Sequence, residues 1–264
     1  MRTLFVNLLA IYRRELQSYF SSPLAYVIAA VFWFIGGLFM VTLLLSPEGV
    51  IAQSAALDQS GIQQKLDAPY EFLKFYLNLL GSLSMFILPM LSMGLYAEER
   101  KQGTLELLAT SPLTNWIVAI GKLLGVLTFY SVMLLPLLIS QSVAFGRSEP
   151  SFPLGLLLLG YGGLLLLAAS VLSLGMFISS LSESTVLAAI MTFGLVLLLW
   201  IVDAIANSAG PASDAIRHLS LLTHYTDFTE GVFDTSGLIL FLSYIVFGIY
   251  LTAQSIDFLR FQRS

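Results

Sequence analysis

Hydrophobic residues fall into six long runs, separated by shorter segments that are rich in polar and charged residues. The runs cover roughly Ala25–Leu45, Leu77–Ala97, Trp116–Ala144, Leu154–Ser179, Val186–Ala206 and Leu238–Ile256. A helix needs about 20 apolar residues to cross about 30 Å of hydrocarbon. The alternating pattern of a membrane β-strand is absent from these runs. We therefore expect an all-α polytopic membrane protein with six transmembrane helices, formed as a single domain over residues 1–264.

Basic residues predict the orientation of these helices. With both termini in the cytoplasm, the inner side holds eight of them and the outer side four. The inner set is Arg2, Arg13, Arg14, Arg100, Lys101, Lys122, Arg260 and Arg263, and the outer set is Lys65, Lys74, Arg147 and Arg217. This bias follows the positive-inside rule. We expect a multi-pass protein of the plasma (inner) membrane of a prokaryote, with cytoplasmic N- and C-termini.

Residues 3–20 predict an amphipathic helix ahead of the first span. Apolar side chains recur every four residues, at Leu4, Leu8, Tyr12, Leu16 and Phe20, while polar residues fill much of the other side. We expect this helix to lie in the cytoplasmic membrane interface. The alternative is a plain extension of the first span, although serine and proline at positions 21 to 23 favour a break. On the outer side, segments 46–75 and 207–236 are each expected to contain a short helix at the membrane surface.

A dense run of charge, Glu98 to Leu108, lies between the second and third apolar runs. It is unusual in a chain that is 57% hydrophobic and 11% charged. A hydrocarbon core cannot hold these charges, so the run is expected in water at the inner membrane surface. The simplest interpretation is a charged loop that only sets topology.

The motifs around this run resemble those of the ABC-2 type permeases. They are Glu98-Glu99-Arg100, then Gly103-Thr104-Leu105-Glu106, then Ser111-Pro112, then Gly121-Lys122 at the start of the third span. Arg14-Glu15-Leu16 with the stretch 20–26, and Thr223-His224-Tyr225 with Gly231 to Asp234 and Tyr244, are similar to the gliding-motility-associated branch. The resemblance covers essentially the whole chain.

This resemblance implies a coupling helix within the loop 98–115, which docks on a separate nucleotide-binding subunit. Gly103 and Thr104 would break the second span and cap the short helix. The docking residues would be Glu98, Glu99, Arg100, Gly103, Thr104, Leu105, Glu106, Leu107 and Leu108, with Glu183 as a second contact. A helix-capping role for Glu183 is the alternative.

ATP is expected to bind on another chain. Gly121-Lys122 lacks the upstream glycine of a phosphate-binding loop and is followed by leucine. The chain is therefore not an enzyme by itself, and a partner ABC ATPase would carry ATP and Mg²⁺. Lys122 either reaches lipid headgroups or contacts the coupling region. Further expected partners are a second permease copy or a related permease, an auxiliary envelope subunit and membrane lipids. A net charge of −4 argues against nucleic acid.

A few residues within or near the spans are candidates for the pathway or its gate. Pro89 and Pro136 should kink the second and third spans, and Asp203 lies at the outer end of the fifth. Asp257 lies at the inner end of the sixth span, and both aspartates are near enough to an interface to be hydrated. Small residues four apart, at Ala25/Ala29, Gly121/Gly125 and Ala169/Ser173, predict close helix contacts.

Histidines near the fifth and sixth spans invite a metal interpretation, which the spacing disfavours. His218 and His224 are not at a standard ligand spacing, and besides Asp227 no further carboxylate is placed to complete a site. We therefore expect no metal and no catalytic residue, and assign His224 to an outer helix at the exit of the pathway.

The expected pathway lining of Leu, Ile, Phe and Met offers no fixed charge near the midplane. It suits an amphipathic substrate such as a lipid or lipid-linked glycan. The resemblance to the ABC-2 type permeases implies the permease subunit of an ATP-driven exporter that moves such a substrate outward. The alternative is a membrane anchor or force-coupling subunit of gliding-type or envelope machinery, with no bulk transport.

Overall fold

The computed structural model describes residues 2–60, 67–104, 114–146, 154–206 and 217–261, and its regular elements in these ranges are all helices. They are α1 (Arg2–Ser21), α2 (Pro23–Leu45), α3 (Val50–Ser60), α4 (Ala68–Ser92), α5 (Gly94–Lys101), α7 (Asn115–Phe145), α8 (Leu154–Leu181), α9 (Thr185–Ala206), α11 (Leu221–Thr229) and α12 (Thr235–Phe261).

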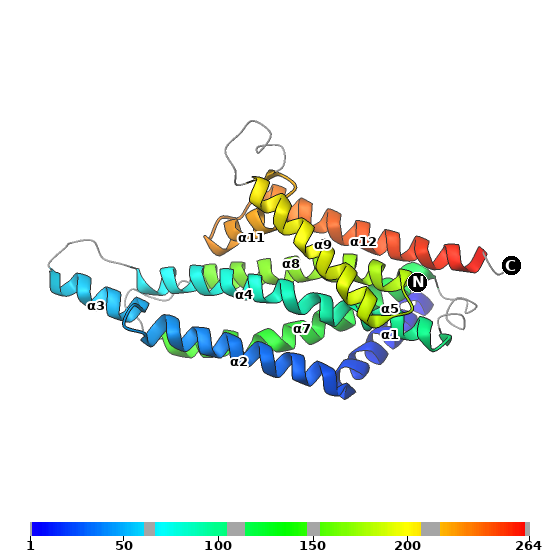
Figure 1. The fold of residues 1–264 in the computed structure, drawn as a ribbon, viewed down its shortest axis with the longest axis horizontal. Helices are drawn as coiled ribbons and strands as arrows, with labels where there is room; N and C mark the ends of the chain where they lie inside the picture. The colour runs from blue at the N-terminus through cyan, green and yellow to red at the C-terminus, as the bar shows by residue number, and fades with distance from the viewer. Residues whose placement is uncertain (1, 61–66, 105–113, 147–153, 207–216, 262–264) are drawn as a thin grey trace.

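Six described stretches are long and apolar enough to cross a membrane, which confirms the predicted all-α class with six spans. These are Pro23–Ala56, Ala68–Lys101, Asn115–Phe145, Leu154–Leu181, Thr185–Ala206 and Thr235–Phe258. The long helices lie alongside one another in a bundle, with α9 at a slant to its neighbours (Figure 1).

The break predicted before the first span is present. Ser22 has an extended backbone (φ −83°, ψ 119°), and Pro23 is the first residue of α2. Proline lacks an amide hydrogen, so it fits the first turn of a helix but not its interior. The chain changes direction at this point, and α1 is a separate helix rather than an extension of the span (Figure 1).

The second span is longer than its apolar run, which was expected over Leu77–Ala97. Its helix starts at Ala68, where the Asp67 side chain accepts a hydrogen bond from the amide of Tyr70 at 3.2 Å. The helix is interrupted once at Met93 and resumes as α5, which ends at Lys101. Hydropathy detects only the apolar middle of this element, because its two ends are amphipathic.

The helix α8 is the centre of the bundle. It packs against α4, α5, α7, α9, α11 and α12. In its most apolar stretch 78% of the residues are buried, against 22% in those of α2 and α9. The core is therefore built around α8, whereas α2 and α9 present most of their apolar surface outward.

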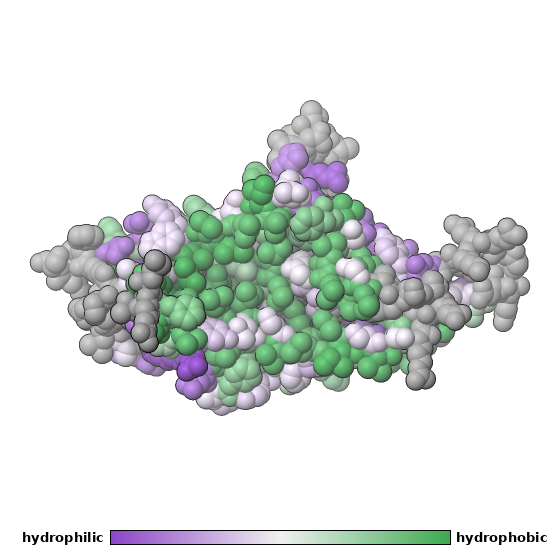
Figure 2. Space-filling view, turned by 180° about the vertical axis from the view of Figure 1, so that it is seen from behind, coloured by the Kyte–Doolittle hydropathy of each residue, from purple (hydrophilic) through white to green (hydrophobic). Residues whose placement is uncertain are grey.

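The two ends of the bundle differ in composition. Both termini lie at one end with α1 and α5, which we call the terminal end, while α3 and α11 lie at the other, the distal end (Figure 1). Hydrophobic residues cover the middle of the face seen in Figure 2, and polar residues gather toward its ends. The short helix expected in 207–236 corresponds to α11. In 46–75 the expectation rests on the spacing from Ile62 to Leu73, whose described part is the first turns of the long helix α4, while the separate short helix α3 lies earlier, at Val50–Ser60. Residues 61–66 and 207–216 lie outside the described ranges.

Several tyrosine hydroxyls inside the bundle have hydrogen-bond partners on neighbouring helices, although that of the buried Tyr96 has none among the described residues. Tyr76 donates to the carbonyl of Gly36 at 3.0 Å, and Tyr130 shares a bond of 2.6 Å with Ser84. Tyr225 of α11 donates to the carbonyl of Leu77. A buried hydroxyl without a partner is costly, so these bonds help to fix the register of the helices.

Candidate functional site

The predicted docking region begins on α5 at the terminal end. The side chains of Glu98, Lys101 and Gln102 are exposed there. The helix ends at Lys101 and Gly103 has a φ of +69°, a conformation that favours glycine. The expected break at Gly103 is therefore present. Thr104 donates its hydroxyl to the carbonyl of Glu99 at 3.2 Å. Leu105, Glu106, Leu107 and Leu108 lie outside the described residues.

The structure brings two of the predicted docking residues together. Arg100 Nε lies 3.4 Å from Glu183 Oε1, and Arg100 Nη1 donates to the carbonyl of Ser180 at 3.0 Å. The Glu183 side chain is 71% exposed. The alternative capping role belongs to Ser184, whose hydroxyl accepts from the amide of Leu187 at 3.4 Å. Glu183 thus lies beside α5 on the same exposed surface.

Three buried charged side chains and one exposed arginine form a chain of ion pairs beside this surface. Lys122 Nζ lies 2.7 Å from Glu15 Oε1 and 3.1 Å from Glu99 Oε1, and Arg14 Nη2 lies 3.2 Å from the same Glu99 oxygen. The Lys122 side chain is only 2% exposed, and its ammonium lies 5.0 Å from the ring centroid of Tyr96. Two cations alternate with two carboxylates, and the second cation, Arg14, reaches Glu99 from an exposed position, with its side chain 62% exposed.

This arrangement changes the roles expected for two residues. Lys122 does not reach lipid headgroups, because α1 covers it; it contacts Glu99, at the start of the charged run. Glu99 is itself buried, so its side chain faces inward rather than toward a docking partner. We refer to Arg14, Glu15, Glu99 and Lys122 as the charge chain. It joins α1, α5 and α7, whose residues are up to 108 positions apart, at one place.

Helix α1 is seated on α7 through two glycines. A Cβ added at Gly121 would lie 2.8 Å from Ile11 Cγ2, and one at Gly125 would lie 2.7 Å from Glu15 Cβ. Both distances are too short for a real side chain, so the two helices approach as closely as glycine permits. The close contact predicted from Gly121/Gly125 is confirmed, and its partner is the N-terminal helix.

The junction between α4 and α5 is held by Ser179 of α8. Its hydroxyl donates to the carbonyl of Met93 at 2.7 Å and accepts from the amides of Tyr96 and Ala97 at 3.1 and 3.0 Å. In an unbroken helix the Ala97 amide would bond the Met93 carbonyl directly. Ser179 therefore stands between the two groups and satisfies both inside the bundle.

The proline candidates lie within helices. Pro89 is four residues before the α4–α5 junction, and Met93 donates its amide to the Pro89 carbonyl at 3.1 Å. Pro136 lies inside α7, which is assigned as one helix from Asn115 to Phe145. Kinks at the two prolines stay a prediction.

The two aspartates near the ends of the fifth and sixth spans accept hydrogen bonds from neighbouring elements. Asp203 of α9 accepts hydrogen bonds from the hydroxyls of Ser220 and Thr223 at 2.6 and 2.8 Å, which ties α9 to the start of α11. Asp257 of α12 accepts from the amide of Asn115 at 2.6 Å, at the start of α7. Both contacts are structural links between elements, one at each end of the bundle.

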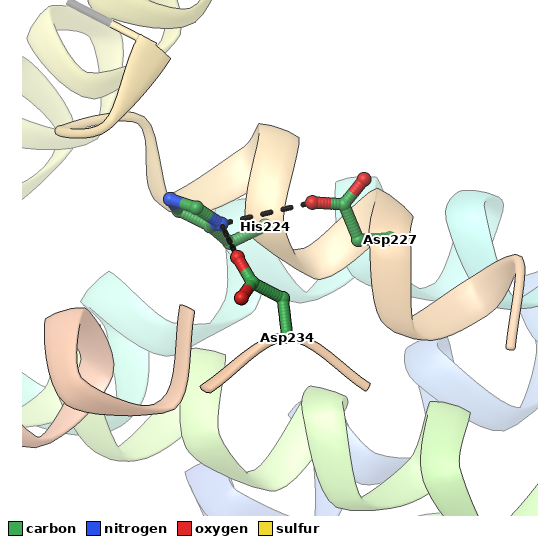
Figure 3. A group of neighbouring side chains, drawn as sticks. All are labelled: His224, Asp227 and Asp234. Atoms are coloured by element: carbon green, nitrogen blue, oxygen red, sulfur yellow. Dashed lines mark ion pairs between the residues drawn. The ribbon is translucent and has the colours of Figure 1, made fainter. Parts of the chain in front are cut away.

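His224 meets two carboxylates at the distal end (Figure 3). Its Nδ1 lies 3.6 Å from Asp227 Oδ2, one turn later on α11, and 3.7 Å from Asp234 Oδ2, in the loop before α12. The hydroxyl and amide of Ser236 donate to Asp234 and hold the pKa of this carboxyl below its usual range. Sequence spacing had offered no carboxylate to complete a ligand set; Asp234 supplies one, and the exposed His218 is not part of the group.

Two open cavities lie between the helices. One, of about 650 Å³, is lined by aliphatic side chains of α7, α8 and α12, with Phe228 and Phe233 beside them. The other, of about 320 Å³, lies between α4, α9 and α11 and is lined in part by Asn78, Ser82 and Asp203. The first can take an apolar chain and the second a polar group.

Sequence reasoning missed Glu15, Ser179 and Asp234. Glu15 is part of the Arg14-Glu15-Leu16 motif, but nothing in the local sequence indicates that its carboxylate faces inward. Ser179 is one of many serines at an apolar helix end. Asp234 is ten residues from His224, so neither periodicity nor a metal-ligand spacing connects them.

Comparison with known proteins agrees with this architecture. The family described as ABC-2 family transporter protein matches residues 50–222, which is more than half of the 264-residue chain. The matched region runs from α3 to the start of α11 and includes the charged run. No curated protein matches the chain. The chain therefore belongs to the ABC-2 family of transporter proteins.

Proposed function

We propose that this chain is the permease subunit of an ATP-driven exporter, which couples ATP hydrolysis on a separate subunit to outward movement of an amphipathic, lipid-like or glycan substrate. Family membership supports a non-catalytic membrane subunit. The charge chain is the observation that supports the coupling role, because it links α5, where the charged run begins, to α1 and α7.

The partner ATPase, which carries ATP and Mg²⁺, docks at the terminal end. The exposed Glu98 and Lys101 and the exposed Glu183 form the polar part of the docking surface. Residues 105–108 supply its apolar part. Glu99 acts as a positioning residue, since its carboxylate holds α5 against Lys122 and Arg14.

Force applied to α5 reaches the rest of the bundle by two routes. The charge chain passes it to α1 and α7, and Ser179 passes it to α8 at the α4–α5 junction. A serine hydroxyl replaces the direct backbone hydrogen bond at this point of the helix. The helix can bend there, because the free carbonyl and amide groups stay bonded to the hydroxyl during small rotations. The Met93 junction is therefore the hinge between the docking surface and the second span.

The aliphatic cavity between α7, α8 and α12 supports an apolar part in the substrate, because an acyl chain matches its lining. The polar cavity near Asn78 and Asp203 lies between other helices and shares no lining residue with it. The helices α2 and α9 have the smallest buried share of the six spans, so their apolar faces are the most exposed of the bundle. This supports a second permease copy or a related permease that packs against them.

The docking surface can be tested by affinity purification of the full-length chain from its native membranes. We expect an ABC ATPase to co-purify, with ATPase activity in the complex and ATP-dependent flux of lipid in proteoliposomes. Glu98→Lys and Leu107→Asp should reduce the ATPase recovered at least about tenfold, which corresponds to about 1.4 kcal/mol of docking energy.

Glu48→Lys is the matched control, because it reverses an exposed acidic residue at the distal end. It should leave recovery unchanged. Full recovery with both docking variants at wild-type membrane levels would contradict the proposed surface. Recovery of the ATPase without any flux would favour the alternative, a force-coupling subunit of gliding-type or envelope machinery.

A further inference from the structure

The group formed by His224, Asp227 and Asp234 has no place in the proposed coupling route, yet its geometry is specific. The three ligand atoms, one nitrogen and two oxygens, lie within 4.8 Å of one another. They come from α11 and from the loop that leads to α12, in which Gly231 has a φ of +84°.

The distances do not fit hydrogen bonds. Nitrogen–oxygen hydrogen bonds are about 2.7–3.2 Å long, whereas Nδ1 is 3.6 and 3.7 Å from its two carboxylate oxygens. Two ligands held about 2.1 Å from one tetrahedral metal ion are about 3.4 Å apart. The observed separations are close to that value for both aspartates at once.

The imidazole is buried and unsatisfied. His224 is only 6% exposed, and its Nδ1 has no hydrogen-bond partner among the described residues although it points at both carboxylates. The first turn of α12 packs on this ring, since a Cβ added at Gly237 would lie 3.1 Å from Nδ1. A buried polar atom without a partner is costly, and a cation between the three side chains would satisfy it.

We propose that His224, Asp227 and Asp234 bind one divalent transition-metal cation, with zinc as the best match, and that this cation clamps α11 to the start of α12. Imidazole nitrogen selects transition metals over magnesium or calcium, and carboxylate oxygens complete a zinc-like set. Three protein ligands leave a fourth position for water.

Neighbouring groups hold the ligands in place. The hydroxyl of Ser236 donates to Asp234 Oδ2 and its backbone amide donates to Asp234 Oδ1. These two hydrogen bonds orient the carboxylate, as hydrogen bonds from neighbouring groups commonly do for metal ligands. The loop that the cation closes also carries Phe233, and Phe228 precedes it on α11; both line the aliphatic cavity. Metal occupancy therefore stiffens one wall of that cavity.

The test uses full-length protein in detergent micelles, purified without a polyhistidine tag, stripped with a chelator and titrated with zinc chloride. We expect one zinc ion per chain after gel filtration, counted by mass spectrometry of the metal. His224→Gln and Asp234→Asn should weaken binding at least about tenfold. His218→Ala, which removes an exposed histidine nearby, should bind like the wild type.

A second measurement reports the ligand geometry. Cobalt in place of zinc should give the visible absorption of a tetrahedral site in the wild type, and His224→Gln should lose it. If that variant does not give a monodisperse protein, Asp227→Asn at a partly exposed position provides the same test.

Wild-type protein that retains no zinc at micromolar concentrations would mean that the three residues form an ion pair only. If His224→Gln and Asp234→Asn bind zinc as tightly as the wild type, or if His218→Ala loses zinc binding, the metal is bound elsewhere. Either result overturns the site.

Discussion

At the scale of single residues, Lys122 shows how a buried charge is made tolerable. Removing an ammonium from water costs several kcal/mol, and only close partners offset that cost. Lys122 has two carboxylates within 3.1 Å, and Arg14 balances the second of them. The result is a group of two cations and two carboxylates that holds three helices together, with Lys122 buried and Arg14 exposed.

Replacing Lys122 by methionine should destabilise the protein by about 3–5 kcal/mol, because Glu15 and Glu99 would remain buried without their shared cation. The unfolding midpoint of the purified protein in detergent measures this. Lys101→Met is the matched control, since Lys101 is exposed on α5, and it should change stability by less than about 0.5 kcal/mol.

Rescue separates lost charge balance from lost packing. Adding Glu15→Gln and Glu99→Gln to Lys122→Met removes the uncompensated charges and should restore part of the lost stability. If Lys122→Met alone proves as stable as Lys101→Met, the charge chain does not hold the terminal end together.

At the scale of elements, the N-terminal helix is a packed part of the bundle. Its residues Ile11 and Glu15 fill the space that Gly121 and Gly125 leave open on α7. The four-residue apolar repeat identifies the helix but not the helix against which it packs. Leu4 and Phe5 remain exposed. Its location in the membrane interface stays a prediction.

Gly125→Val should dislodge α1, because the new side chain would overlap the Cβ of Glu15. Hydrogen–deuterium exchange should then speed up at least about tenfold across the amides of α1, which reflects a loss of about 1.4 kcal/mol or more of local stability. Gly194→Val in α9 is the control, since a Cβ there meets nothing within 4 Å. Equal exchange in the two variants would show that the glycine contact does not hold α1.

At the scale of the whole molecule, the two ends must face opposite sides of the membrane. An even number of spans returns both termini to one side, as Figure 1 shows for the bundle. The positive-inside bias predicts that this side is the cytoplasm. The docking surface and the proposed metal site then lie on opposite faces, about one membrane thickness apart.

The chain contains no cysteine, so single cysteines can test this orientation directly. Lys101→Cys should react with a membrane-impermeant maleimide only in inverted vesicles, and His218→Cys only in intact cells or spheroplasts. Both positions are exposed on the chain, and vesicles washed free of the ATPase leave Lys101 uncovered, so a lack of reaction then reflects sidedness rather than burial. Labelling of Lys101→Cys from outside would refute the cytoplasmic docking surface.

The sequence by itself determined the six spans, the separate helix before Pro23 and the break at Gly103. Each of these depends on local hydropathy or on the backbone limits of proline and glycine, which act over a few residues. The tertiary structure alone decided that Lys122 meets Glu15, that Ser179 enters the α4–α5 junction and that Asp234 joins His224. Those contacts depend on which helices pack together and at what register. Packing sets both, and no local pattern in the chain records them.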